Sequence, residues 1–209
     1  MRNSKVTKMV QMAILIAIIA LMAFTPIGFI KTAGLEIQLI MIPVVIGAML
    51  FGPLAGAVCG GAFGVLSFIQ CFGMSQFGVM LLSINPFLTF LVCIPTRILA
   101  GYLTGLLFQW FKKIDKTKTV CYFAGGLIGA VLNTVFFMSV LMLSFGNTDF
   151  MKSLNAGNLN VFAFVVAFVG INGLLEWPVT CIAGGAISKA VQKLSLIHIS
   201  EPTRLQLIS

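Results

Sequence analysis

Long apolar stretches, separated by short polar segments, dominate the chain from residue 9 to residue 192. Stretches of about 20 apolar residues are long enough to cross the roughly 30 Å hydrocarbon layer of a membrane as helices. Six transmembrane spans are predicted: residues 9–24, 39–51, 54–72, 85–111, 120–144 and 160–192. The pattern therefore predicts an all-α integral membrane protein with six transmembrane helices.

Turn-forming residues mark two of the connections between these spans. Gly52 and Pro53 separate the second span from the third, which predicts a tight hairpin. Residues 25–38, between the first and second spans, contain one proline and two glycines, and we expect them to form an ordered extracellular loop or lid. The first span lacks a small-residue cleavage site before polar sequence, so we expect it to be retained as a membrane helix.

The distribution of lysine and arginine predicts which side of the membrane each connection faces. Segments expected on the same side as the N-terminus contain nine basic residues, against two on the opposite side, Lys31 and Lys152. The nine are Arg2, Lys5, Lys8, Lys112, Lys113, Lys116, Lys118, Lys189 and Lys193. Because basic residues are concentrated in cytoplasmic segments, we expect both termini to be cytoplasmic.

Composition agrees with a membrane protein and argues against several other classes. Of the 209 residues, 59% are hydrophobic and 9% are charged, which is foreign to soluble domains. The net charge of +8 does not indicate nucleic-acid binding, because the basic residues cluster at loop ends. No C-x-x-C pair occurs, and we expect buried thiols rather than disulfides or a zinc site. The five cysteines are Cys59, Cys71, Cys93, Cys121 and Cys181.

Residues 194–209 differ in character from the rest of the chain. Leu194–Arg204 resembles a translated sequencing adapter, and Leu205–Ser209 fits the continuation of the same primer. We therefore expect a single membrane domain over residues 1–193, followed by a non-native tail. The single histidine, His198, lies in this tail and is given no role.

Four polar side chains lie deep within the predicted spans, where such groups are unfavourable unless they have a partner or a function. They are Arg97, Asn133, Asn172 and Glu176. The first three lie 11 or 12 residues from the expected extracellular ends of their spans. At about 1.5 Å per residue they are roughly 17 Å deep, and Glu176 follows Asn172 by one turn. Polar groups at matching depth predict a pocket for a small solute.

Small residues recur every four positions in several spans, a spacing that lets helix backbones approach closely in lipid. The glycines are Gly56, Gly60 and Gly64, then Gly101 and Gly105, then Gly125 and Gly129. We expect these glycines to pack helices of this chain against one another. Ala13 and Ala17 give the first span a similar pair.

Several short motifs, taken in order, resemble the substrate-binding S components of energy-coupling factor (ECF) vitamin transporters. The motifs are Ala13–Ala17 with Phe24–Ile30, Ile42–Ala48 followed by Phe51–Gly56, Asn85 and Pro86 with Pro95–Arg97, Asn133 and Thr134, and Asn172–Glu176. Each is loose alone, but their order and spacing between Lys5 and Lys193 are specific. Within the family, the chain is most similar to the pantothenate branch, with cobalamin-type members close by.

The resemblance implies a multi-pass protein of the prokaryotic plasma membrane that captures a vitamin, with pantothenate as the best match. It also implies partners: a transmembrane coupling protein, EcfT, and two ABC-type ATPases. Ala13 and Ala17 then belong to the docking face for the coupling protein. The alternatives are another vitamin, cobalamin or riboflavin, or a self-contained secondary transporter that works without an ATPase.

Two interpretations of the buried polar residues stay open. In the first, Arg97 holds the carboxylate of pantothenate, while the asparagines bind its amide and hydroxyl groups. In the second, Arg97 and Glu176 pair with each other, and the asparagines bind backbone groups across helices. Nearer the expected extracellular surface, Gln76 and Asn85 either contact the ligand or its entrance, or belong to ordinary polar loops.

The sequence argues against an enzyme. Apart from His198 in the tail there is no histidine, one acidic residue lies within a span, and no G-x-x-x-x-G-K-[ST] phosphate loop occurs. Neither a catalytic residue, a metal ligand nor a bound cofactor is expected, and ATP hydrolysis has to come from another protein.

Overall fold

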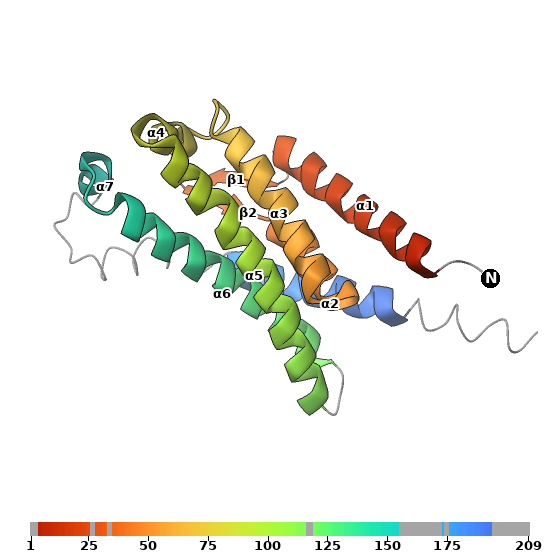
Figure 1. Cartoon of the computed structure of the whole chain (residues 1–209). Helices are drawn as coiled ribbons and strands as arrows, with labels where there is room; N and C mark the ends of the chain where they lie inside the picture. Colours follow the sequence, from red (N-terminus) through yellow and green to blue (C-terminus); the bar gives the residue numbers. More distant parts are fainter. Residues whose placement is uncertain are drawn as a thin grey trace, which may run out of the picture.

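The computed structural model describes residues 4–25, 28–32, 35–115, 119–154, 173 and 176–193. Its labelled elements are α1 (Ser4–Phe24), β1 (Phe29–Thr32), β2 (Leu35–Gln38), α2 (Met41–Phe51), α3 (Pro53–Gln70), α4 (Gln76–Ile84), α5 (Pro86–Ile114), α6 (Val120–Phe145) and α7 (Asp149–Leu154). A further helix, the C-terminal helix, covers residues 176–193. The long helices pack in the order α1, α3, α5 and α6 (Figure 1).

Four described helices are long and apolar enough to cross a membrane: α1, α3, α5 and α6. They match four of the predicted spans within a few residues. The predicted second span corresponds to α2, whose 11 residues reach only about 17 Å, roughly half of the hydrocarbon layer. Of the predicted sixth span, residue 173 and the C-terminal helix lie within the described residues. The count of six transmembrane helices therefore stays a prediction.

The predicted hairpin between the second and third spans is confirmed. Helix α2 ends at Phe51 and α3 begins at Pro53, so Gly52 alone connects them. Gly52 has a φ of 97°, a backbone conformation that residues with a side chain rarely adopt. Pro53 then starts α3 at a position where the missing N–H has no helical partner to lose.

Four short elements were not predicted from the sequence. Strands β1 and β2 form an antiparallel hairpin, with Phe29 opposite Gln38 and Thr32 opposite Leu35. The expected ordered loop over residues 25–38 thus contains strands, which corrects the all-α prediction locally. Helices α4 and α7 extend the ends of the bundle at the N-terminus of α5 and the C-terminus of α6 (Figure 1). Strands of four residues and helices of six to nine carry too little periodicity to stand out among long apolar runs.

Glycines bring α3 and α5 into backbone contact along their whole shared length. A Cβ at Gly56 would lie 2.3 Å from the carbonyl oxygen of Gly101, and a Cβ at Gly60 would lie 2.2 Å from that of Arg97. Gly64 lies in the same way against the backbone of Cys93. The expectation that these glycines pack helices within the chain is confirmed, and α3 and α5 run antiparallel.

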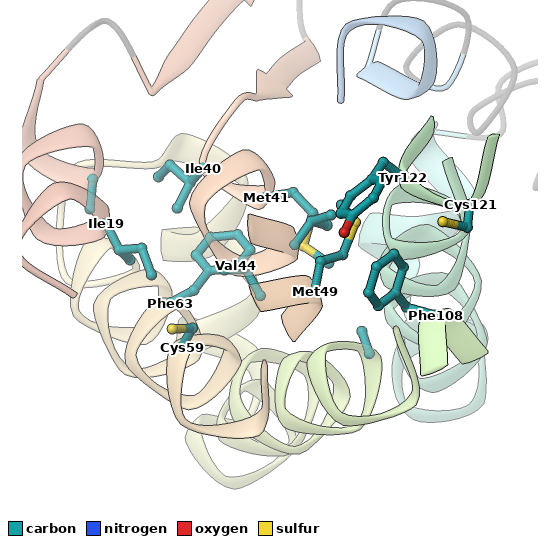
Figure 2. Packing of buried hydrophobic residues seen from close by; sticks show 13 residues of the cluster. Ile19, Ile40, Met41, Val44, Met49, Cys59, Phe63, Phe108, Cys121 and Tyr122 are labelled. Carbon is teal, nitrogen blue, oxygen red and sulfur yellow. The ribbon is translucent and has the colours of Figure 1, made fainter. Parts of the chain in front are cut away.

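Helix α2 lies at the centre of the larger of two hydrophobic cores. Its residues from Pro43 to Met49 are all buried, as expected for a helix that is apolar on every side. Figure 2 shows Met41, Val44 and Met49 between residues of α1 and α3, such as Phe63, and the Phe108 and Tyr122 side chains of α5 and α6. The short helix therefore fills the interior of the bundle.

The second core lies at the end of the bundle where α4 and α7 pack on the long helices. Its buried residues are Leu81, Val92, Met138, Leu141, Phe145 and Met151, with Phe137 packed against them. Arg97 lies between the two cores, because it contacts Phe63 of the first core and Phe137 at the border of the second.

Candidate functional site

Arg97 is the charged residue at the centre of the candidate site. It lies on α5, and its side chain is 2% exposed. The Nη1 group donates a hydrogen bond of 3.0 Å to the carbonyl oxygen of Cys93, one turn earlier on the same helix. Arginine side chains on helices point toward the N-terminus, which explains this contact. The Nε group is buried and has no hydrogen-bond partner among the described residues.

Two aromatic rings contact the Arg97 guanidinium. Its Cζ atom lies 4.5 Å from the centroid of the Phe63 ring and 5.2 Å from that of the Phe137 ring. Phe63 comes from α3 and Phe137 from α6, so three helices meet at this charge. A cation over an aromatic face is attracted to the ring, and burial strengthens the attraction.

The backbone of Arg97 is held in place by the close approach of α3. Because Gly60 has no side chain, α3 lies directly against the Arg97 carbonyl group. The same contact places the Phe63 ring, three residues later on α3, beside the guanidinium. The close contact between α3 and α5 at Gly60 thus sets the position of the Arg97 guanidinium.

Asn133 lies on α6, one turn before Phe137, and is 6% exposed. Its Oδ1 atom is buried and has no hydrogen-bond partner within the described part of the chain. Phe137 contacts Arg97, so Asn133 and Arg97 belong to adjacent turns of the α5–α6 interface. Asn133 and Arg97 thus both lie near the Phe137 ring, and their convergence on one ligand stays a prediction.

Glu176 is the first residue of the C-terminal helix as defined above and is also 6% exposed. The next residue, Trp177, donates from Nε1 to Thr134 Oγ1 at 3.3 Å, which ties this part of the helix to α6. Between the described residues Arg97 and Glu176 no ion pair forms, but their charges attract each other at longer range. Asn172 lies outside the described residues.

The two polar residues predicted near the entrance occupy different environments. Asn85 is the N-cap of α5: its Oδ1 accepts hydrogen bonds from the backbone N–H groups of Phe87 at 3.0 Å and Leu88 at 3.2 Å. Gln76 is the first residue of α4 and is exposed. The Asn85 side-chain oxygen thus caps a helix, which favours a structural role for this residue over contact with the ligand.

Ala13 and Ala17 are both exposed on α1. The opposite side of this helix packs into the first core through Ile19 and Ala23, which are 0% and 3% exposed. Large apolar residues flank the alanines on the exposed side, among them Met9, Ile14 and Leu21. The face with the two alanines is therefore open to lipid or to another protein.

Sequence reasoning missed three residues that shape the site region. Phe63 and Phe137 contact Arg97, but 19 phenylalanines in the chain gave no means of selecting them. Gln70 is 6% exposed and its Nε2 donates to the carbonyl oxygen of Ala23, tying the end of α3 to the end of α1. Gln70 could have been noticed in the sequence, because its amide lies within an otherwise apolar stretch.

The arrangement is suited to binding a small molecule. It offers hydrogen-bond donors on a buried cation and an acceptor on a buried amide, in surroundings of low polarity where such groups interact strongly. Among the described residues, no group of three or more His, Cys, Asp or Glu side chains is placed to hold a metal ion. A small molecule with an anionic group and polar groups near it would complement these atoms.

Comparison with known proteins gives two matches. Residues 7–183 match the family described as ECF transporter, substrate-specific component. The chain is also 31% identical, over 186 residues, to the "Pantothenate transporter PanT" of Leuconostoc mesenteroides. That alignment covers 84% of this chain and 87% of the relative.

Proposed function

Since the chain belongs to the substrate-specific components of ECF transporters, we propose that it captures pantothenate from outside the cell. We propose further that it delivers the vitamin through the coupling protein EcfT, driven by two ABC-type ATPases. The choice of pantothenate as the ligand rests on the buried Arg97, whose Nε has no hydrogen-bond partner among the described residues, in a chain similar to a pantothenate transporter. A transporter subunit of this family is not expected to catalyse a reaction.

In this proposal Arg97 holds the pantothenate carboxylate. A guanidinium removed from water is unfavourable unless an anion and hydrogen-bond acceptors compensate it. In the described residues its donors contact one backbone carbonyl, and its charge faces two rings and attracts the Glu176 carboxylate without forming an ion pair. The ligand carboxylate would supply an anion in direct hydrogen-bond contact. Asn133 and Asn172 would bind the amide and hydroxyl groups, and Glu176 would accept from a hydroxyl or orient Arg97.

Substitutions of Arg97 test this assignment. Arg97→Ala should lose most pantothenate binding, and Arg97→Lys should restore part of it, because an ammonium lacks the planar fork of donors. The decisive variant combines Arg97→Ala with Glu176→Gln. If Arg97 serves only to neutralise Glu176, this double variant should be stable and bind pantothenate like the parent, which would contradict the assignment. If it is stable and does not bind, whereas Glu176→Gln alone still binds, Arg97 contacts the ligand.

We also propose the membrane topology: six transmembrane helices within a domain of residues 1–193, both termini cytoplasmic, in the plasma membrane of a prokaryote. The excess of basic residues on one side supports this orientation. Cysteines introduced as Lys31→Cys and Lys116→Cys lie on opposite sides in this topology. An impermeant thiol reagent added to intact cells should label the first and leave the second unlabelled; equal labelling would exclude the topology.

The face of α1 that contains Ala13 and Ala17 is proposed to dock on the coupling protein. Its exposure and its small side chains support close approach of a second helix surface. The contrasting possibility is a self-contained transporter, which needs no such surface. Vesicles containing this chain alone should bind pantothenate without accumulating it, and accumulation without an ATPase would favour the self-contained transporter.

A further inference from the structure

The surroundings of the Arg97 guanidinium leave one of its edges available. A guanidinium has five N–H donors in a fixed plane. Nη1 donates to the Cys93 carbonyl oxygen, and the rings of Phe63 and Phe137 contact the group through their π-faces. Nε is buried and has no hydrogen-bond partner among the described residues. The hydrogen bond that Arg97 makes there comes from Nη1, which leaves the edge formed by Nε and Nη2 for a ligand.

We propose that Phe63 and Phe137 are positioning residues, which hold the guanidinium so that its Nε–Nη2 edge faces the ligand and selects a planar carboxylate. This inference rests on the proposed function, because it concerns how the same site recognises the carboxylate of its ligand. It adds two residues that no motif indicated, and a reason why the site distinguishes an anion from a neutral analogue.

The rings are suited to this task because they orient a cation without using its hydrogen bonds. Phe63 is 1% exposed and belongs to the first core, so its ring is fixed by packing. Phe137 comes from α6, so the guanidinium is held from two helices besides its own. A polar residue in either place would take one of the donors that the ligand needs, whereas a phenylalanine leaves them all free.

The available edge fits a carboxylate better than any neutral group. Nε and Nη2 point in the same direction and are spaced to donate to both oxygens of one carboxylate. A hydroxyl in the same place can accept at one oxygen and brings no charge to the buried cation. Pantothenate and pantothenol, in which CH2OH replaces the carboxylate, therefore probe this edge while the rest of the ligand stays the same.

The experiment compares the affinities of the purified protein for pantothenate and pantothenol by titration calorimetry. The parent should prefer pantothenate. Phe137→Leu and Phe63→Leu should weaken pantothenate binding by about 5- to 20-fold and change pantothenol binding by less than about twofold. Phe137→Tyr keeps the ring and should keep the preference. Phe136→Leu on the same helix and Phe108→Leu in the same core are the matched controls, and should leave the preference unchanged.

Each outcome separates the inference from the proposed function. Equal losses for both ligands in the Phe63 and Phe137 variants would mean that the rings only support the fold, and would overturn the inference while pantothenate stays the ligand. Unchanged pantothenate binding in both leucine variants would overturn it too. A parent protein that binds neither ligand would overturn the proposed ligand, and the inference with it. Melting temperatures of all variants show whether each one is folded.

Discussion

Gly60→Ala is the substitution for which the structure gives the clearest magnitude. The new methyl group would lie 2.2 Å from the carbonyl oxygen of Arg97, whereas real Cβ atoms essentially never come closer than 3.0 Å. The neighbouring atom belongs to the backbone, so it cannot rotate away. Helices α3 and α5 therefore have to separate by at least about 0.8 Å, the difference between these distances, at the centre of their seam.

The free energy of unfolding should fall by about 2 kcal/mol. Overpacking of a well-packed interior is destabilising by about 1–3 kcal/mol, and a backbone neighbour places this site at the upper end. The higher helix propensity of alanine offsets about 1 kcal/mol. For a protein of this size, about 2 kcal/mol corresponds to a fall in melting temperature of about 4–8 °C. Pantothenate affinity should fall as well, because the separation displaces Arg97.

Gly61→Ala, at the next residue, is the matched control. Its Cβ would lie 3.4 Å from the Ile98 side chain, an ordinary contact, so it should leave the melting temperature unchanged or raise it slightly. Four of the five cysteines are buried, so a thiol-reactive fluorogenic dye reports unfolding during a temperature ramp. Equal melting temperatures for the two alanine variants would refute the backbone contact between α3 and α5.

Three further substitutions test other parts of the structure. Gln70→Leu removes the buried hydrogen bond to the end of α1 and should lower stability by about 1 kcal/mol, measured by the same thermal assay. Asp115→Ala removes a carboxylate that accepts two backbone N–H bonds at the start of α6, so it should lower stability by about 1 kcal/mol, whereas Asp115→Asn should retain most of it. Ala13→Trp combined with Ala17→Trp should abolish uptake in cells while the purified protein still binds pantothenate, and an equal loss of binding would assign these alanines a structural role.

Hydropathy alone located the four long helices, because a helix that crosses lipid needs about 20 apolar residues and nothing else in a chain produces such runs. The glycine spacing likewise predicted close helix packing, and the break at Gly52 and Pro53 predicted the turn between α2 and α3. The deep polar residues were found in the same way, since a charge or amide stands out against an apolar background. Their common depth was predicted by counting residues along regular helices.

Which surfaces meet was decided by the tertiary structure. The sequence contains many phenylalanines and several glycines with equivalent local surroundings, and only the packing of α3 and α6 around α5 selects Phe63 and Phe137 as the neighbours of Arg97. The sequence also left open whether Arg97 pairs with Glu176, because that depends on a few ångströms between separate helices. Apolarity does not distinguish contact with lipid from contact with protein, so the sequence alone did not show that the 11 residues of α2 pack against protein on every side. Packing on every side places that helix in the core.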